Sequence, residues 1–165
     1  MAVRIVNLDN VVSQLKAYRK RTEKKVKLLM EELATLGAYR ARVEFSRAMY
    51  AGNNDTVVSV ETTASGFRIV AEGEAVIFIE FGTGVINPEH PLSTEFGYAH
   101  GTYGQGKGAD PNGWVYVGEQ GNAGQTIRDG VYRTRGNPPA RAMYNSAEEM
   151  RKEVFRMAKE VFARD

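Results

Sequence analysis

The chain has 165 residues, no cysteine and a formal net charge of +2. The lack of cysteine excludes disulfides, thiolate nucleophiles, iron–sulfur clusters and cysteine-ligated zinc. Hydrophobic residues make up 42% and charged residues 25%, which is typical of a single globular domain. No apolar run approaches the roughly 18 residues of a membrane span, and the first residues lack the apolar core of a signal peptide. We therefore expect a soluble protein made in a reducing cytosol.

Charge is unevenly distributed along the chain. Residues 1–50 contain 11 Lys and Arg against 5 Asp and Glu, whereas residues 51–136 contain 5 against 10. The first part is therefore +6 and the second −5. A basic segment followed by an acidic one indicates electrostatic complementarity, either within the fold or between copies of it.

The basic segment predicts a long N-terminal helix over residues 8–50. Asp9 or Asn10 is suited to cap the helix, and apolar or small side chains recur every three or four residues after it. Gly37 interrupts this pattern. Over 38–50 the periodicities of helix and strand compete, and we favour a helix because many of these residues are good helix formers.

Short strands are expected next, over 56–62, 67–72 and 75–81, with turn residues between them. The third is almost entirely apolar or aromatic, which favours a central position with both faces covered. The connections are too short for crossovers, so we predict an antiparallel β-meander over 56–81.

Residues 82–136 form a glycine-rich segment that holds 13 of the 17 glycines. A strand is predicted over 114–118, with a second candidate at 130–134, whereas 82–112 reads as one long loop. Loops of that length are uncommon in compact domains and are often functional. Its aromatic side chains need a surface to pack on, which indicates contacts with another subunit or protein. The candidates for such contacts, which include one lysine, are Phe96, Tyr98, His100, Tyr103, Lys107, Trp114 and Tyr116.

A C-terminal amphipathic helix is predicted over 138–164. Its apolar positions alternate steps of four and three residues and form one seam. Pro138 and Pro139 are acceptable in a first helical turn, whereas 146–149 has the spacing of a capping box, so the helix begins at one place or the other. The seam consists of Met143, Ala147, Met150, Val154, Met157 and Val161. Together the elements predict one α+β domain whose small antiparallel sheet is braced by the N-terminal and C-terminal helices.

Two motifs suggest chemistry without completing it. Gly101–Gly108 contains the G-x-x-x-x-G-K part of a phosphate-binding loop, but no Ser or Thr follows Lys107 and the next residues cannot propagate a helix. His90 and His100, with a nearby glutamate, would suit a two-histidine, one-carboxylate metal site. We interpret them as loop histidines. The sequence therefore predicts no enzyme, no cofactor and no metal.

Seven basic residues lie close together in the predicted N-terminal helix, with Glu23 the only acid among them. On a helix they cover most of the circumference outside the apolar stripe. They form either a solvated polar face or a surface for phosphates or for an acidic partner. The candidate DNA or acidic-partner contacts are Lys16, Arg19, Lys20, Arg21, Lys24, Lys25 and Lys27.

The segment Val70–Val85 (VAEGEAVIFIEFGTGV) resembles the hairpin with an EFGTG-type ending found in minor tail, or tail-completion, proteins of long-tailed double-stranded-DNA phages. The long charged helix before it and the glycine-rich loop after it fit the same order. Pro138–Met143 resembles the family's Pro-Phe-Leu-type entry to a C-terminal helix, although Ala142 and Met143 replace the usual bulky pair.

This resemblance implies a structural virion component at the head–tail junction (neck) or upper tail, a head–tail joining or tail-completion protein without catalytic activity. It implies a homo-oligomeric ring, expected to be a hexamer, with connector and tail proteins as neighbours and DNA in its lumen. Synthesis in the host cytoplasm and no contact with membranes are expected.

Within this segment we interpret Glu80, Phe81, Gly82, Thr83 and Gly84 as a structural motif. Glu80 lies between apolar residues, and if its carboxylate points inward it must be paired. Thr83 or a basic side chain of the N-terminal helix is the expected partner. Gly82 and Gly84 permit a sharp turn with positive φ.

Two alternatives to assembly remain from the residues themselves. The basic helix suits a nucleic-acid-binding module without sequence specificity, because no recognition helix, zinc finger or RNA-binding motif accompanies it. A small hydrolase with a Glu and His site in the glycine-rich loop is the other.

Overall fold

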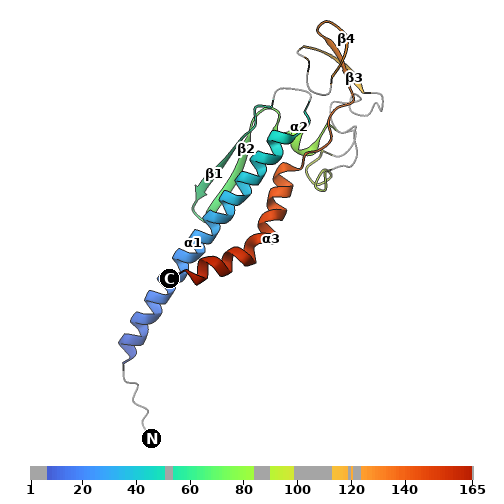
Figure 1. Ribbon diagram of the computed structural model, residues 1–165. Coiled ribbons are helices and arrows are strands. Elements are labelled where there is room, and N and C mark those ends of the chain that lie inside the picture. The colour runs from blue at the N-terminus through green and yellow to red at the C-terminus, as the bar shows by residue number, and fades with distance from the viewer. Residues whose placement is uncertain are drawn as a thin grey trace.

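A single long helix, α1 (Leu8–Arg47), is the axis on which the first β-hairpin and the C-terminal helix pack (Figure 1). The computed structural model describes residues 7–50, 54–83, 90–98, 113–118, 120 and 124–164. The remaining elements are β1 (Val57–Thr63), β2 (Gly66–Glu72), α2 (Val76–Phe81), β3 (Trp114–Val117), β4 (Gln125–Arg128), β5 (Val131–Thr134) and α3 (Ala142–Ala163). The predicted α+β class is confirmed: a long N-terminal helix, small antiparallel sheets and a packed C-terminal helix.

Helix α1 continues for 40 residues without a break at Gly37, which confirms the helix favoured over 38–50 as far as Arg47. A Cβ on Gly37 would lie 2.5 Å from both Ile69 Cδ1 and Met150 Sδ. The hairpin and α3 therefore both approach α1 at this residue, and the glycine serves packing rather than helix termination. The expected caps are wrong, because the helix begins at Leu8, before Asp9.

The hydrophobic core lies where the C-terminal half of α1 meets the hairpin, α2 and the start of α3. Small buried side chains on α1 let these elements approach closely. Ser146 of α3 donates a hydrogen bond to the Gly37 carbonyl at 2.7 Å, which joins the two long helices where their backbones are close. The buried core residues are Ala38, Ala41, Phe45, Val58, Ala75, Ile79 and Ala142.

The strand predicted over 75–81 is wrong, because Val76–Phe81 form helix α2. A short, continuously apolar run suits a buried helix as well as a buried strand. Asp55 decides between them: its carboxylate accepts the N–H groups of Glu74 and Ala75 at 2.8 and 3.1 Å, where the helix starts. The meander is therefore reduced to the β1–β2 hairpin, paired from Val57 with Glu72 to Thr63 with Gly66.

A second, three-stranded antiparallel sheet has the order β3-β5-β4. The strands predicted at 114–118 and 130–134 are confirmed, while β4 was not predicted. Trp114 and Tyr116 are half-buried, and Val115 and Val117 between them are exposed, as alternation along a strand requires. Within the described residues, no helix is long and apolar enough to cross a bilayer.

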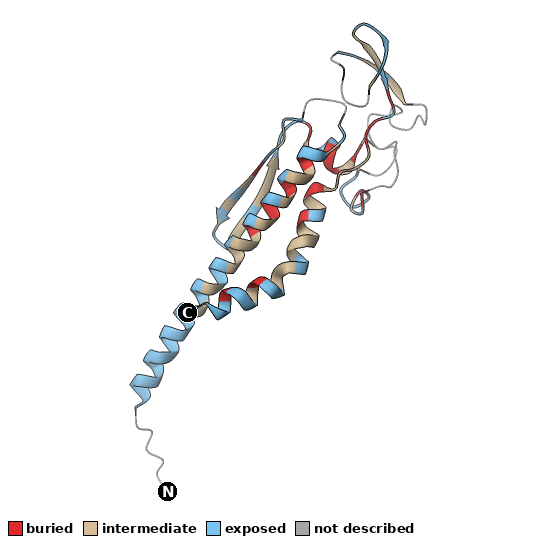
Figure 2. Ribbon diagram, in the orientation of Figure 1, coloured by how far each residue is buried: buried red, intermediate tan, exposed pale blue. Residues whose placement is uncertain are grey.

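The first part of α1 projects beyond the rest of the structure (Figures 1 and 2). Every residue from Leu8 to Arg21 is exposed, and the first buried residue of the helix is Ala34. We call Leu8–Arg21 the arm.

We predict that Gly37→Leu lowers the free energy of unfolding by about 1–3 kcal/mol, because the added side chain must push the hairpin and α3 away from α1. The measurement is urea unfolding followed by circular dichroism. Thr35→Leu, at an exposed position of the same helix, is the matched control and should leave stability unchanged or slightly raised. Equal effects of the two substitutions would contradict the close packing at Gly37.

The two backbone N–H groups that Asp55 accepts hold its pKa below the ordinary value of 3.8. A carboxyl whose pKa is lower in the folded than in the unfolded chain stabilises the fold above the unfolded pKa, and this contribution disappears as the pH falls. We therefore expect the wild type to be more stable than Asp55→Asn at neutral pH. The difference should shrink as the pH drops below about 4. A difference in unfolding free energy that does not change with pH would show that the Asp55 charge contributes nothing.

Candidate functional site

The carboxylate of Glu80 lies in the last turn of α2 and is buried. Its Oε2 accepts the Met143 N–H at 2.8 Å and its Oε1 accepts the Tyr144 N–H at 3.0 Å. These N–H groups belong to the first turn of α3, where no preceding carbonyl is available to accept them. A negative charge at this end of a helix is also favoured by the helix dipole. Glu80 therefore caps α3 from another helix.

The side chain of His90 supplies a third donor to Glu80. His90 Nε2 lies 3.1 Å from Glu80 Oε1, and His90 Nδ1 accepts the Leu92 N–H at 3.1 Å. Because a backbone N–H can only donate, Nδ1 carries a lone pair and the ring proton is on Nε2. The histidine is therefore neutral, and both of its nitrogens are used. Glu80 does point inward, and it is paired as a buried carboxylate must be, but the expected partners, Thr83 or a basic side chain of the N-terminal helix, are wrong.

Aromatic rings surround the histidine and anchor residues 90–98 to the two helices. The Phe81 ring lies 4.4 Å from His90 and 4.6 Å from Tyr98, centroid to centroid. Tyr144 meets His90 edge-on at 5.4 Å, and Phe96 lies 5.8 Å from Phe81. Of the two predicted contact residues in this segment, Tyr98 is half-buried and Phe96 is exposed.

Thr83 and Asn137 continue the same set of contacts. The Thr83 N–H donates to the Asn137 carbonyl at 3.1 Å, and the Asn137 N–H donates to Thr83 Oγ1 at 2.8 Å. Gly82 has φ 75°, and a Cβ on it would lie 2.7 Å from Pro139 N. Glycine is required there by both backbone conformation and space, whereas Gly84 lies outside the described residues.

The end of α2 and the start of α3 satisfy each other's backbone groups. Asn137 Nδ2 donates to the Phe78 carbonyl at 2.9 Å, and the Ala140 N–H donates to the Ile79 carbonyl at 2.8 Å. The Arg141 N–H donates to the Glu80 carbonyl at 3.1 Å. Carbonyls at a helix C-terminus and amides at a helix N-terminus normally lack partners. We call this arrangement, made by Glu80, His90, Thr83, Asn137 and the first turn of α3, the Glu80 lock.

The chemistry of the Glu80 lock is that of a structural joint. The carboxylate is occupied by three donors, and neither nitrogen of His90 is left to act as a base or to bind a ligand. In the part of the chain that the structure describes, no three His, Cys, Asp or Glu side chains gather as a metal ion would require.

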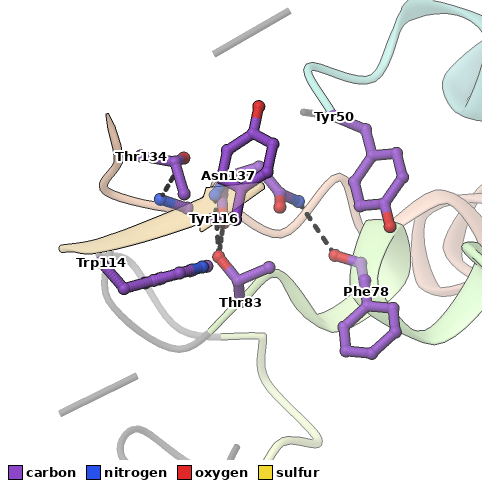
Figure 3. A pocket seen from close by; sticks show the side chains of 8 residues that line it. Tyr50, Phe78, Thr83, Trp114, Tyr116, Thr134 and Asn137 are labelled. Carbon is purple, nitrogen blue, oxygen red and sulfur yellow. Dashed lines mark hydrogen bonds between the residues drawn. The ribbon is translucent and has the colours of Figure 1, made fainter. Parts of the chain in front are cut away.

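A cavity of about 250 Å³ lies beside the Glu80 lock, between α2 and the second sheet (Figure 3). Its walls are mainly aromatic, and they include two of the predicted contact residues, Trp114 and Tyr116. The lining residues are Tyr50, Phe78, Thr83, Trp114, Tyr116, Thr134, Gly136 and Asn137. Trp114 and Tyr116 thus pack over a cavity within their own chain, and the exposed face of their strand belongs to Val115 and Val117.

The seven basic residues predicted to contact DNA or an acidic partner, which lie between Lys16 and Lys27 of α1, differ in their surroundings. Lys25 Nζ donates to the carbonyls of Phe162 and Arg164, and it thereby neutralises the C-terminal end of α3. Arg19 pairs with Glu23 at 2.7 Å. Among the described residues no ion pair or hydrogen bond partner is found for the other five, which are Lys16, Lys20, Arg21, Lys24 and Lys27. The remaining predicted contact residues His100, Tyr103 and Lys107 lie outside the described residues.

No protein-family model matches the chain, and neither the curated proteins nor the solved structures that were compared with it give a match. The geometry of the chain itself therefore carries the functional interpretation.

We predict that Glu80→Gln lowers the free energy of unfolding by about 2–3 kcal/mol, because the amide replaces a charged acceptor and directs its NH₂ group toward an N–H donor. Urea unfolding monitored by circular dichroism measures the change. Glu95→Gln, at an exposed position of the neighbouring 90–98 segment, is the matched control and should have no measurable effect. A Glu80 variant as stable as the control would show that the carboxylate is not the joint between α2 and α3.

Proposed function

We propose that this chain is a structural subunit of a phage neck or tail, a head–tail joining or tail-completion protein that assembles into a homo-oligomeric ring. Its likeness to the EFGTG-type ending supports this proposal, and so does the structural rather than catalytic geometry of the Glu80 lock. The observation that carries it is the arm, which exposes a continuous apolar stripe that no other described residue covers.

The stripe consists of the apolar side chains that point to one side of the arm. At 3.6 residues per turn, Leu8, Val11, Leu15 and Tyr18 lie on one side of the helix. Each is at least 50% exposed, and Tyr18 is 63% exposed. Full burial of one such side chain stabilises by about 1.5–3 kcal/mol, so an apolar stripe of this kind indicates a surface that another protein covers.

The length of the arm supports the same conclusion. In proteins most of the stability of a helix comes from tertiary packing of its apolar face rather than from helix propensity. The 14 residues Leu8–Arg21 make no packing contact with the rest of the described chain that buries any of them. A neighbouring subunit that covers the stripe would stabilise the arm as a helix.

Non-specific nucleic-acid binding is the second candidate, because five basic side chains of α1 have no partner among the described residues. Phosphate contacts use the basic side chains but bury none of the apolar stripe. Assembly uses both features, and we therefore prefer it.

Light scattering of the full-length protein over a range of concentrations tests the proposal. We expect particles several times heavier than the 18.3 kDa chain, with ring shapes in electron micrographs. Leu15→Glu combined with Tyr18→Glu should shift the protein to monomers without loss of helix, because charges on the stripe cannot be buried between subunits. A wild type that remains a monomer at every concentration would defeat the proposal.

The same preparations separate the two candidates. DNA affinity measured against salt concentration should fall steeply, with several counterions released, if the basic residues bind phosphates. That result from a monomeric chain would favour nucleic-acid binding over assembly.

A further inference from the structure

The end of the molecule opposite the arm carries an acidic and apolar surface. Val57 and Glu72 are cross-strand partners where the hairpin begins and ends. Asp55 binds the backbone at Glu74, and Ile77 follows in the first turn of α2. All five residues are exposed, with Val57 at 62% and Ile77 at 42%. We call them the acidic patch.

The negative charge of the acidic patch is not neutralised within the chain. Within the hairpin, Arg68 pairs with Glu61, and no described basic residue pairs with Asp55, Glu72 or Glu74. The pKa of Tyr50 is raised by its partial burial and by the negative charges of Asp55 and Glu74.

Basic residues near this end of α1 have other roles. Arg42 donates to the Val58 carbonyl at 2.8 Å through Nη2. Arg47 lies in the last turn of the helix, where a cation is favoured by the helix dipole. The surface therefore offers three carboxylates and two exposed apolar side chains.

The arm has the complementary composition. It carries four basic residues, Lys16, Arg19, Lys20 and Arg21, against the single acid Asp9. At 100° per residue, Lys16 and Arg21 lie on the two sides of the apolar stripe. The arm thus presents apolar side chains together with positive charge, and the acidic patch presents apolar side chains together with negative charge.

The two surfaces cannot meet within one chain. The acidic patch lies by the C-terminal end of α1 and the arm is its N-terminal end, as the course of the helix in Figure 1 shows. Helical residues rise about 1.5 Å each, so Arg21 and Arg47 are about 40 Å apart along a single continuous helix. The match can therefore be satisfied only between molecules.

We propose that the arm of one copy docks on the acidic patch of the next copy, which makes a head-to-tail interface. This inference rests on the proposed function, because it specifies how the subunits of the ring contact one another. An interface between two different surfaces repeats from subunit to subunit, and it closes into a ring when the rotation between neighbours allows it. Side-by-side pairing of two arms is disfavoured, because it would bring their basic residues together.

Charge reversal in the full-length protein tests this interface. Lys16→Glu with Arg21→Glu gives one variant, and Glu72→Lys with Glu74→Lys gives the other. Each should raise the protein concentration needed for half-assembly by about tenfold or more, because like charges then face each other. The chain that carries all four substitutions should assemble within about threefold of the wild-type concentration, because the attraction is restored with its sign exchanged.

The matched control reverses two exposed lysines of α3, Lys152→Glu with Lys159→Glu, and should assemble like the wild type. Circular dichroism verifies that every variant is folded. Loss of assembly in each pair and its recovery in the fourfold variant would support the interface, even where one pair alone is poorly folded.

The outcomes also separate this inference from the proposed function. If the wild type assembles and either reversed pair assembles equally well, or the fourfold variant fails to recover, the head-to-tail interface is overturned and the structural role stands. If the wild type never assembles, the proposed function fails and the interface fails with it.

Discussion

The fold depends on one buried carboxylate. Glu80 lies in the last turn of α2, caps the first turn of α3 and pairs with His90. Three parts of the chain that are far apart in sequence therefore meet at its two carboxylate oxygens. An isolated buried charge is prohibitive, but this one is surrounded by three donors and lies at the positive end of a helix dipole. In return, the Asn137 side chain and the backbone N–H groups just before α3 donate hydrogen bonds to the carbonyls at the end of α2. Neither helix end has to remain exposed to water to satisfy its hydrogen bonds.

The packing that the Glu80 lock fixes is confined to one part of the molecule, and the arm lies outside it. With α2 and α3 fixed to each other, the hairpin and α3 can both pack on α1 around Gly37. All of this packing involves the C-terminal half of α1. The arm receives no share of it and remains an exposed helix with an apolar stripe and a basic border.

Much of the fold could be predicted because it follows from local patterns. The three- and four-residue spacing of apolar side chains identifies α1 and α3, and alternation with turn residues identifies β1 and β2. The sequence also indicates that Glu80, between Ile79 and Phe81, must be paired if its carboxylate points inward. These features require only the residues within a few positions of one another.

The predictions that are wrong depend on contacts between residues that are far apart in the sequence. Whether 75–81 forms a helix or a strand depends on Asp55, about twenty positions earlier, which binds the N–H groups where α2 begins. The partners of Glu80 are ten and more than sixty positions away, and a single sequence gives no signal that connects them. His90 is a loop histidine, as the sequence predicts, but no pattern around it signals that it is buried against Glu80. Its character as a buried joint residue comes entirely from the Leu92 N–H and Glu80 that fix its proton.

The geometry of α1 determines whether the basic and acidic segments of the sequence can contact each other within one chain. A basic segment and an acidic segment in one chain would ordinarily attract each other and fold together. Here a continuous helix holds the arm and the acidic patch at opposite ends, so that attraction cannot be satisfied internally. Lys25 shows what happens where the geometry does allow it, because it turns inward to the C-terminal end of α3. Among the described residues, no such partner is found for Lys16, Lys20 and Arg21 of the arm. In the head-to-tail interface that we propose, a continuous helix that separates complementary charges converts an internal attraction into one between molecules, and it gives the contact a direction.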